Sequence, residues 1–346
     1  MKLQYIILLG SILALEGCGG GTSSGTTVDN TTNSSDTSSM QILKDLKSLV
    51  KKTGQTEEYV SYDDGYYQKG KSAEYSRDDT TNIVTDQITG LMWQDKDLGY
   101  KVLVSEDNVE NGNTSDMSGD TANTFCMNLD FGGYTDWRLP TLLEVESIME
   151  NTDTGLNNIF EEQSRSLWTI SPAIERKGMF WYAEMDKNVH NRWFGDDEKG
   201  VRCVRGSSNL EDTGDYYNRL SSGIVVDLNS GLEWQDDYSD NNNEVKTANW
   251  EDAISYCENL VLGDNSDWRL PNKNELLSIV DHRRYSPAIN QKFINTKYPV
   301  YYWTSTSQDN SNAIAIEFEE GSSYTWEKDD DAAKYLNVRC VRGTEK

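Results

Sequence analysis

Four cysteines are the residues of this sequence best suited to chemistry. A thiol can act as a nucleophile, a metal ligand or half of a disulfide. The four fall into two pairs, Cys126 with Cys203 and Cys257 with Cys340, one pair in each of two related halves. No Cys-x-x-Cys and no histidine lies near any of them in the sequence, which disfavours a metal site or a catalytic thiol. Because the chain also carries an export signal, we predict two disulfides, each joining the first helix of a half to its last strand.

Two segments pair an acid with a base at a spacing that can serve catalysis, Asp136 with Arg138 and Asp267 with Arg269. Their identical placement in both halves favours a scaffold role instead, with each arginine paired to nearby carboxylates beside a buried tryptophan. The chain has two histidines, and neither a nucleophile–base arrangement nor a phosphate-binding glycine loop emerges from it. We therefore expect no catalysis.

Two acidic runs are candidates for a calcium site. They contain Asp236, Asp237 and Asp240, and Asp329, Asp330 and Asp331. Carboxylate oxygens in flexible loops are ligands that Ca²⁺ takes. The spacing does not match an EF-hand, however, and charged loops are usually only solvated, so both interpretations stay open.

Aromatic and polar residues late in each half are candidates to bind a ligand. They are Tyr182, His190, Arg192 and Trp193 in the first half, and Tyr324, Trp326 and Lys328 in the second. Exposed rings beside polar groups suit stacking on sugars. The bland alternative, that these residues belong to the core or to a hairpin face, is favoured.

The net charge of the chain disfavours two classes of partner. It has 346 residues, with 58 acids against 32 bases and a formal net charge of -26. Binding to nucleic acid or to anionic lipid needs clustered Lys and Arg, so neither is expected. The one compact basic cluster of the body, His282-Arg283-Arg284, is interpreted as a cap at a helix C-terminus.

The N-terminal segment predicts export and a lipid anchor. The apolar run over residues 5–15 is too short to span a bilayer but suits a signal peptide. Leu15-Glu16-Gly17-Cys18 resembles a bacterial lipoprotein lipobox, which implies acylation of Cys18 and an outer-membrane location. We expect a signal peptide over 1–17, a flexible tether over 18–39, and a stalk helix with its linker over 40–69. The alternative is an ordinary secretory signal with an incidental Cys18.

The body is one unit written twice, over 70–206 and 210–346. Four motifs recur in the same order: Thr/Ser-Gly-Leu-x-Trp-Gln, Asp-Trp-Arg-Leu-Pro, Trp-Thr and Val-Arg-Cys-Val-Arg-Gly. Their tryptophans are Trp93, Trp137 and Trp168 in the first copy, and Trp234, Trp268 and Trp303 in the second.

Each copy begins with a predicted β-hairpin around a glycine turn, followed by a helix that carries the first cysteine. A second helix follows Leu-Pro, where Thr141-x-x-Glu144 and Asn272-x-x-Glu275 form capping boxes. Strands are predicted over 180–185 and 313–318, and over Val-Arg-Cys-Val-Arg. The expected fold class is α+β: a hairpin, two helices and a mostly antiparallel sheet with one disulfide in each copy.

This order of motifs resembles a bacterial domain of unknown function first noted at the C-terminus of Legionella collagen-like proteins. The resemblance covers both copies. It implies two tandem C-type-lectin-like domains, distantly related to formylglycine-generating enzymes, with variable loops for ligands. It also implies adhesin-like binding of sulfated polysaccharides, which the net charge of -26 opposes.

The hypothesis that follows is a surface lipoprotein whose tandem lectin-like domains bind an extracellular glycan or protein without catalysis. No cofactor is required, although Ca²⁺ is possible. The alternatives are a structural or envelope-assembly protein with no small ligand, and an unrecognised or degenerate enzyme.

Overall fold

The computed structural model describes residues 50–96, 101–102, 121–150, 156–161, 166–175, 179–194, 199–207, 216–297 and 300–343. All of them belong to one compact unit. The predicted signal peptide, Cys18, the tether and residues 40–49 of the predicted stalk helix lie outside the described residues. None of the helices in the described residues has both the length and the apolar character that crossing a bilayer requires.

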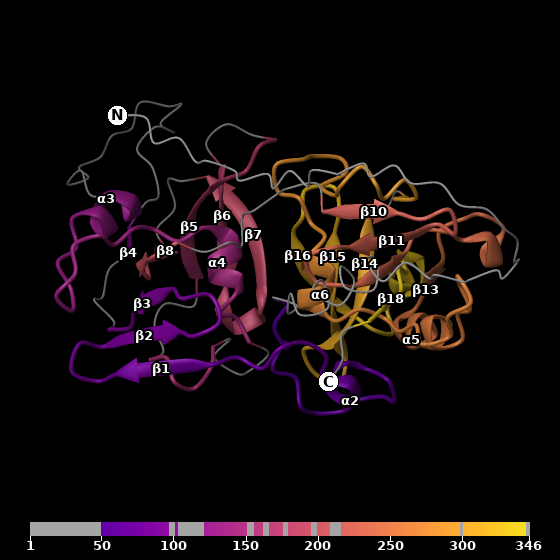
Figure 1. The fold of residues 1–346 in the computed structure, drawn as a ribbon, viewed down its shortest axis with the longest axis horizontal. Coiled ribbons are helices and arrows are strands. Elements are labelled where there is room, and N and C mark those ends of the chain that lie inside the picture. The colour runs from indigo at the N-terminus through magenta and orange to yellow at the C-terminus, as the bar shows by residue number, and fades with distance from the viewer. Residues whose placement is uncertain are drawn as a thin grey trace, which may run out of the picture. The chain divides into compact units, whose positions relative to one another are not determined.

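The first repeat contains two β-sheets (Figure 1). The four-stranded sheet has the order β1-β2-β3-β9, made of β1 (Tyr75–Asp78), β2 (Ile83–Asp86), β3 (Met92–Gln94) and β9 (Val204–Arg205). The five-stranded sheet has the order β4-β8-β5-β6-β7, made of β4 (Lys101–Val102), β8 (Lys199–Gly200), β5 (Ser166–Pro172), β6 (Met179–Glu184) and β7 (Val189–Phe194). The helical elements are α3 (Ala122–Met127), α4 (Leu142–Glu146) and the 3-10 turn η1 (Met185–Lys187).

The second repeat reproduces this topology. Its four-stranded sheet runs β10-β11-β12-β18, made of β10 (Tyr217–Arg219), β11 (Ile224–Asp227), β12 (Glu233–Gln235) and β18 (Val341–Arg342). Its five-stranded sheet runs β13-β17-β14-β15-β16, made of β13 (Thr247–Ala248), β17 (Leu336–Asn337), β14 (Tyr301–Ser307), β15 (Asn312–Glu317) and β16 (Ser323–Glu327). The helical elements are α5 (Trp250–Glu258), α6 (Lys273–Leu277), η2 (Ser239–Asn241) and η3 (Asp331–Tyr335). In both repeats one strand pair is parallel, β5 with β8 and β14 with β17.

The described residues are therefore mostly β-sheet with a few short helices. The content of β-sheet is higher than the predicted α+β class implies. The hairpins and the strands over 180–185 and 313–318 are found within a residue or so of their predicted places, and the second helix of each repeat starts as predicted but ends about three residues earlier. The Val-Arg-Cys-Val-Arg strand is shorter than predicted, because the amide of Cys203 bonds to the side chain of Gln94 instead of to a neighbouring strand.

Local sequence explains the two best-formed connections. Asp86 Oδ1 accepts a hydrogen bond from the amide of Ile88, and Gly90 takes a φ of 75°, which closes the β2–β3 turn at a conformation that glycine adopts without strain. After Leu-Pro, both predicted capping boxes are present, and each satisfies two amides at the start of its helix. Figure 1 shows α4 beside β6 and α6 beside β15, which the turns place there.

The repeated tryptophans build the same core twice. Trp93 and Trp234 are fully buried, each in an apolar cluster that also contains the hairpin leucine of its repeat. The tryptophans of the two later motifs lie in a second cluster with the cysteines. These residues are Trp137 and Trp168 in the first repeat, and Trp268 and Trp303 in the second.

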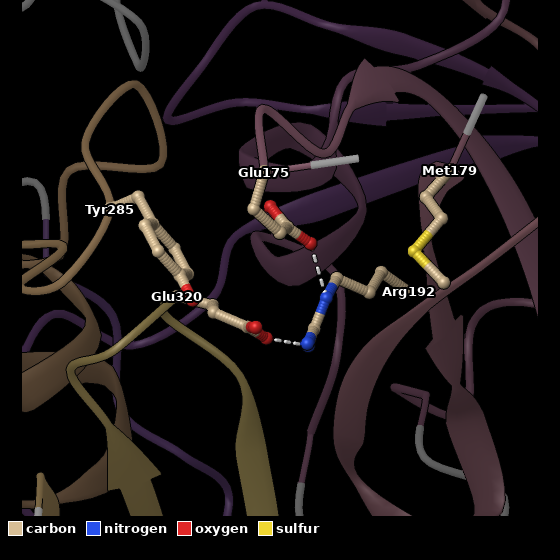
Figure 2. Close-up of a pocket in the computed structure, with 5 residues that line it drawn as sticks. All are labelled: Glu175, Met179, Arg192, Tyr285 and Glu320. Carbon is tan, nitrogen blue, oxygen red and sulfur yellow. Dashed lines mark ion pairs between the residues drawn. The ribbon is translucent and has the colours of Figure 1, made fainter. Parts of the chain in front are cut away.

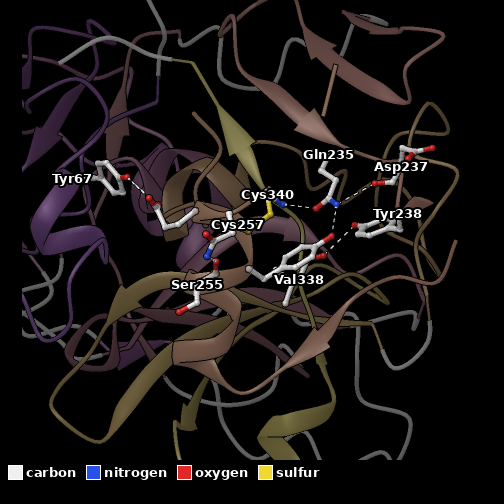
Figure 3. Close-up of a disulfide and its surroundings, with 11 residues drawn as sticks. Tyr67, Gln235, Asp237, Tyr238, Ser255, Cys257, Val338 and Cys340 are labelled. Atoms are coloured by element: carbon white, nitrogen blue, oxygen red, sulfur yellow. Dashed lines mark hydrogen bonds between the residues drawn. A yellow bond between two sulfur atoms is a disulfide. The ribbon is translucent and has the colours of Figure 1, made fainter. Parts of the chain in front are cut away.

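Both predicted disulfides are confirmed. Cys126 bonds to Cys203 and Cys257 to Cys340, with Cα–Cα distances of 5.6 and 5.4 Å. Figure 3 shows the second bond beside Gln235, whose side-chain oxygen accepts from the amide of Cys340. Each bond ties a helix to the strand that closes the four-stranded sheet, so it fixes the two layers of its repeat together.

Residues 50–71 are not the simple linker that the sequence suggested. Val50 lies in the core of the second repeat, and residues 50–52 are not helical. The Lys51 side chain pairs with Asp86 of the first repeat at 2.7 Å, while its carbonyl accepts from Asn274 of the second. The short helix α2 (Asp64–Tyr67) buries Asp64 against Thr306. This segment is therefore shared by both repeats.

Candidate functional site

The two repeats contact each other along the edges of their five-stranded sheets. Strand β7 ends the sheet of the first repeat and β16 ends that of the second. The backbone amide of His190 on β7 donates to Ser323 Oγ on β16 at 2.8 Å. An exposed edge strand presents unpaired backbone groups, and here the two edge strands lie against each other.

An open pocket of about 390 Å³ lies at this boundary. The first repeat contributes Glu175, Met179 and Arg192, and the second contributes Tyr285 and Glu320. Figure 2 shows Arg192 reaching between the two glutamates, with Tyr285 and Met179 at opposite sides. The Arg192 guanidinium forms ion pairs with both carboxylates and also donates to Ser322 Oγ at 3.2 Å.

Carboxylates outnumber cations around this pocket. Glu317 is 6% exposed, and burial, together with the charges of Glu319 and Glu175, raises its pKa to about 7. Glu319 also raises the pKa of Tyr285, whose ring is 48% exposed. The pocket thus offers carboxylate acceptors, a guanidinium donor, a phenol and an apolar methionine. Such a mixture can hydrogen-bond hydroxyl groups and pack against the apolar face of a ring.

Comparison with family models assigns the repeats. The model of the Lcl C-terminal domain matches residues 82–205 and again residues 223–342, most of the chain. This chain belongs to the Lcl C-terminal domain family. No curated protein matches the chain. Residues 50–71 lie outside both matched Lcl C-terminal domains, although they pack against both.

The Asp-Trp-Arg-Leu-Pro segment has a structural use in both Lcl C-terminal domains. Arg138 contacts both oxygens of Glu144, the capping-box glutamate, and Arg269 contacts Glu275 in the same way. The aspartates pair with the last arginine of each repeat: Asp136 with Arg205 at 2.7 Å, and Asp267 with Arg342 at 2.7 Å. The motif therefore ties the second helix to the closing strand, in keeping with the scaffold interpretation.

Of the residues that the sequence selected for ligand binding, Arg192 alone lines this pocket. Tyr182 is buried against Trp168 at a ring separation of 5.8 Å. Tyr324 and Trp326 each pack on Tyr301, at 5.7 and 5.5 Å, and form a partly buried aromatic row on β16. The side chain of Trp193 lies outside the described residues.

Asp236, one of the candidate calcium ligands, has the contacts of a structural carboxylate. It is fully buried, pairs with Arg219 and Arg339, and accepts from the amide of Ile294. Its counterpart in the first domain, Asp95, pairs with Arg202 and Arg77 in the same way. The Trp-Gln-Asp sequence shared by both copies carried this signal.

The other five acids also have local roles or lie in solvent. Asp237 accepts from the amide of Ser239, Asp330 caps η3 and Asp331 pairs with Lys334. Asp240 and Asp329 are exposed. In the part of the chain that the structure describes, no three acidic, histidine or cysteine side chains converge as a metal site would require.

A polar cluster at the boundary between the domains was missed by sequence reasoning. Glu146 pairs with His190, both histidine rings contact Trp181, and Lys273 and His282 of the second domain act on the charge of Glu146. His282 is therefore not a helix cap: α6 ends at Leu277, and the histidine ring packs on Trp181 at 4.9 Å. These residues come from both copies at places where the copies differ, so self-comparison gave no signal for them.

Proposed function

We propose that this chain is a surface-anchored bacterial lipoprotein that binds an extracellular ligand, without catalysis, between its two Lcl C-terminal domains. The pocket at the domain boundary carries the proposal. It brings an exposed tyrosine, a methionine and three charged side chains around one open volume, and small-ligand sites combine apolar walls with a few polar groups in this manner. In the same proposal each domain has a C-type-lectin-like fold, residues 1–17 are a signal peptide and Cys18 is the outer-membrane anchor.

A neutral glycan fits the pocket better than an anion. Arg192 already holds two carboxylates, so a sulfate would have to displace one of them and would then face the other. The net charge of -26 opposes polysulfate at longer range as well. Sugar hydroxyls can donate to the carboxylates and accept from the guanidinium without displacing either.

Binding of neutral and sulfated glycans to the full-length chain in detergent tests this proposal. Tyr285→Ala removes the exposed ring of the pocket, and we expect at least tenfold weaker binding to any glycan that the parent chain selects. Tyr335→Ala is the matched control, because that ring is 66% exposed, lies on η3 and is not among the residues that line the pocket. Equal loss in both variants, or no loss in either, would place the ligand elsewhere.

The anchor is tested separately. Cys18→Ser should abolish incorporation of labelled fatty acid and move the protein from the membrane fraction to the soluble fraction. Label that persists in the variant would refute the lipobox proposal and leave the pocket proposal intact.

An envelope-assembly role is the second candidate. Its supporting observation is that residues 50–71 and the edge strands join the two domains by buried contacts, which suits a spacer of fixed geometry. Absence of glycan binding, together with specific co-purification of one envelope protein, would favour this role.

A further inference from the structure

The two histidines of this chain meet in the boundary between the repeats. His190 lies on β7, and His282 lies between α6 and β14 in the second repeat. Their ring centroids are 5.7 Å apart, and Trp181 contacts both rings edge to face. Because the rings come from different repeats, the state of one affects how well the repeats fit together.

His190 has acceptors at both ring nitrogens. Nε2 lies 2.6 Å from the carbonyl oxygen of Gly321, and Nδ1 lies 2.5 Å from Glu146 Oε1. Ser323 Oγ also lies 3.1 Å from Nδ1, so the second repeat contacts this ring at both nitrogens. Burial works against the charge of Glu146, but His190, His282 and Lys273 together hold its pKa below the usual range.

His282 is in the opposite situation. Both of its ring nitrogens are buried, and neither has a hydrogen-bond partner among the described residues. Gly321 packs so closely that a β-carbon at this position would lie 2.7 Å from Nδ1. Burial, and to a smaller degree His190, lowers the pKa of His282 to about 4, although Glu146 and Asp281 act in the other direction. A proton on this ring therefore places a positive charge in the boundary, with no acceptor for either N–H among the described residues.

We use the word joint for the contact of β7 and Trp181 in the first repeat with β16 and His282 in the second. We propose that protonation of His282 opens this joint in acid. Once the repeats separate, water can solvate the imidazolium, which the closed joint cannot. The pocket is built from the same segments: Arg192 follows His190 on β7 by two residues, Glu320 precedes Gly321, and Tyr285 follows His282 by three. Opening therefore takes the pocket apart. Acid release of a ligand rests on the proposed function, but the opening itself does not.

The titratable neighbours of His282 set the direction of the pH effect. Glu146 on α4, His190 on β7 and Asp281 on its own segment face His282, and Lys273 on α6 also acts on Glu146. Lys273 is held separately by the oxygens of Asn188, each at 2.7 Å. Because the pKa of His282 in the closed joint lies below the ordinary 6.5, the closed state is fully stable above that pH and weakens toward pH 4. The ratio of open to closed joint should rise by up to about tenfold for each pH unit in this window.

Hydrogen exchange and histidine NMR on the full-length chain in detergent test the proposal without any ligand. With two histidines in the sequence, the ring signals form two sets that a single substitution assigns. Between pH 6.5 and 4 we expect the His282 signal to titrate while strands β7 and β16 lose exchange protection. His282→Phe keeps a ring against Trp181 but takes no proton, so its joint should stay closed at least one pH unit lower. Arg284→Gln, an exposed neighbour, should behave like the parent chain.

Acid opening of His282→Phe at the parental pH would overturn the proposal. So would protection of β7 and β16 in the parent chain down to pH 4. If the phenylalanine variant does not fold, the parent decides: a His282 signal that titrates while both strands stay protected also refutes the idea. A chain that opens in acid but binds no glycan supports the acid opening of the joint and contradicts only the proposed function.

Discussion

The interiors of the two repeats are near copies, whereas the faces that they turn toward each other are not. Inside, each repeat buries an aspartate that pairs with two arginines. Asp95 pairs with Arg77 and Arg202, and Asp236 pairs with Arg219 and Arg339. Each also carries the same capping box and the same disulfide. Duplicate contacts of this kind hold one repeat together and need no partner.

At the boundary, equivalent positions hold different residues. The first residue of the capped helix is Leu142 in one repeat and Lys273 in the other, and the last is Glu146 or Leu277. His190 and Ser323 also occupy equivalent places in β7 and β16, by strand register, and these two residues contact each other. Equivalent surfaces thus meet as they do in a two-fold dimer, but their chemistry has become asymmetric.

The largest expected effect comes from the disulfides, which test whether the two repeats are equally stabilised. Replacing both cysteines of either bond by serine should lower the free energy of unfolding by about 4 kcal/mol, because the closed loops of 77 and 83 residues are nearly equal. Urea denaturation of the two double variants measures it. A cost confined to one repeat would show that the copies are not energetically alike.

The buried aspartates should give the next largest effect. Asp95→Asn or Asp236→Asn leaves buried arginines without their counter-ion, and we expect a loss of about 3 kcal/mol in each case. Asp240→Asn is the control, because this aspartate is exposed and should change little. If calcium raised the free energy of unfolding of the parent chain but not that of Asp236→Asn, the structural role of Asp236 would be contradicted.

Lys273 sharpens the contrast at the boundary. Lys273→Met should cost about 2 kcal/mol, because two oxygens of Asn188 lose their donor. Leu142→Met at the equivalent position conserves shape and should cost about 1 kcal/mol or less. Hydrogen exchange should show the lysine variant loosened at η1 and β7. Equal costs would argue that the two faces are interchangeable.

The smallest effect, counted per pH unit, concerns Asp64, which belongs to the segment present only once. Burial raises its pKa to about 7, against donation from Thr53 and Thr306. A carboxyl whose pKa is raised by folding stabilises the fold when protonated, so its contribution is complete below about pH 4 and is lost as the pH rises to 7. Stability should fall by about 1 kcal/mol per pH unit in that window. Glu317 acts in the same direction, so Asp64→Asn should reduce this slope without removing it.

The duplicated features were open to prediction because the sequence prints them twice. Self-comparison located Cys257 with Cys340, the arginine of each Asp-Trp-Arg, and the capping boxes. It missed Glu175, Tyr285 and Glu320, which differ between copies and converge only when two sheet edges meet. Asp236 stayed among the calcium candidates because an acid-rich run hides one buried member among solvated ones, and only the matching Asp95 distinguishes it.

The edge contact between β7 and β16 has a consequence for truncation. A repeat cut from the chain keeps its edge strand but loses the strand that covers it, so its free amides and carbonyls become a template for another chain. Since equivalent positions already meet across this edge, two copies of one excised repeat would find each other in the same orientation. We therefore expect an excised repeat to self-associate where the intact pair does not.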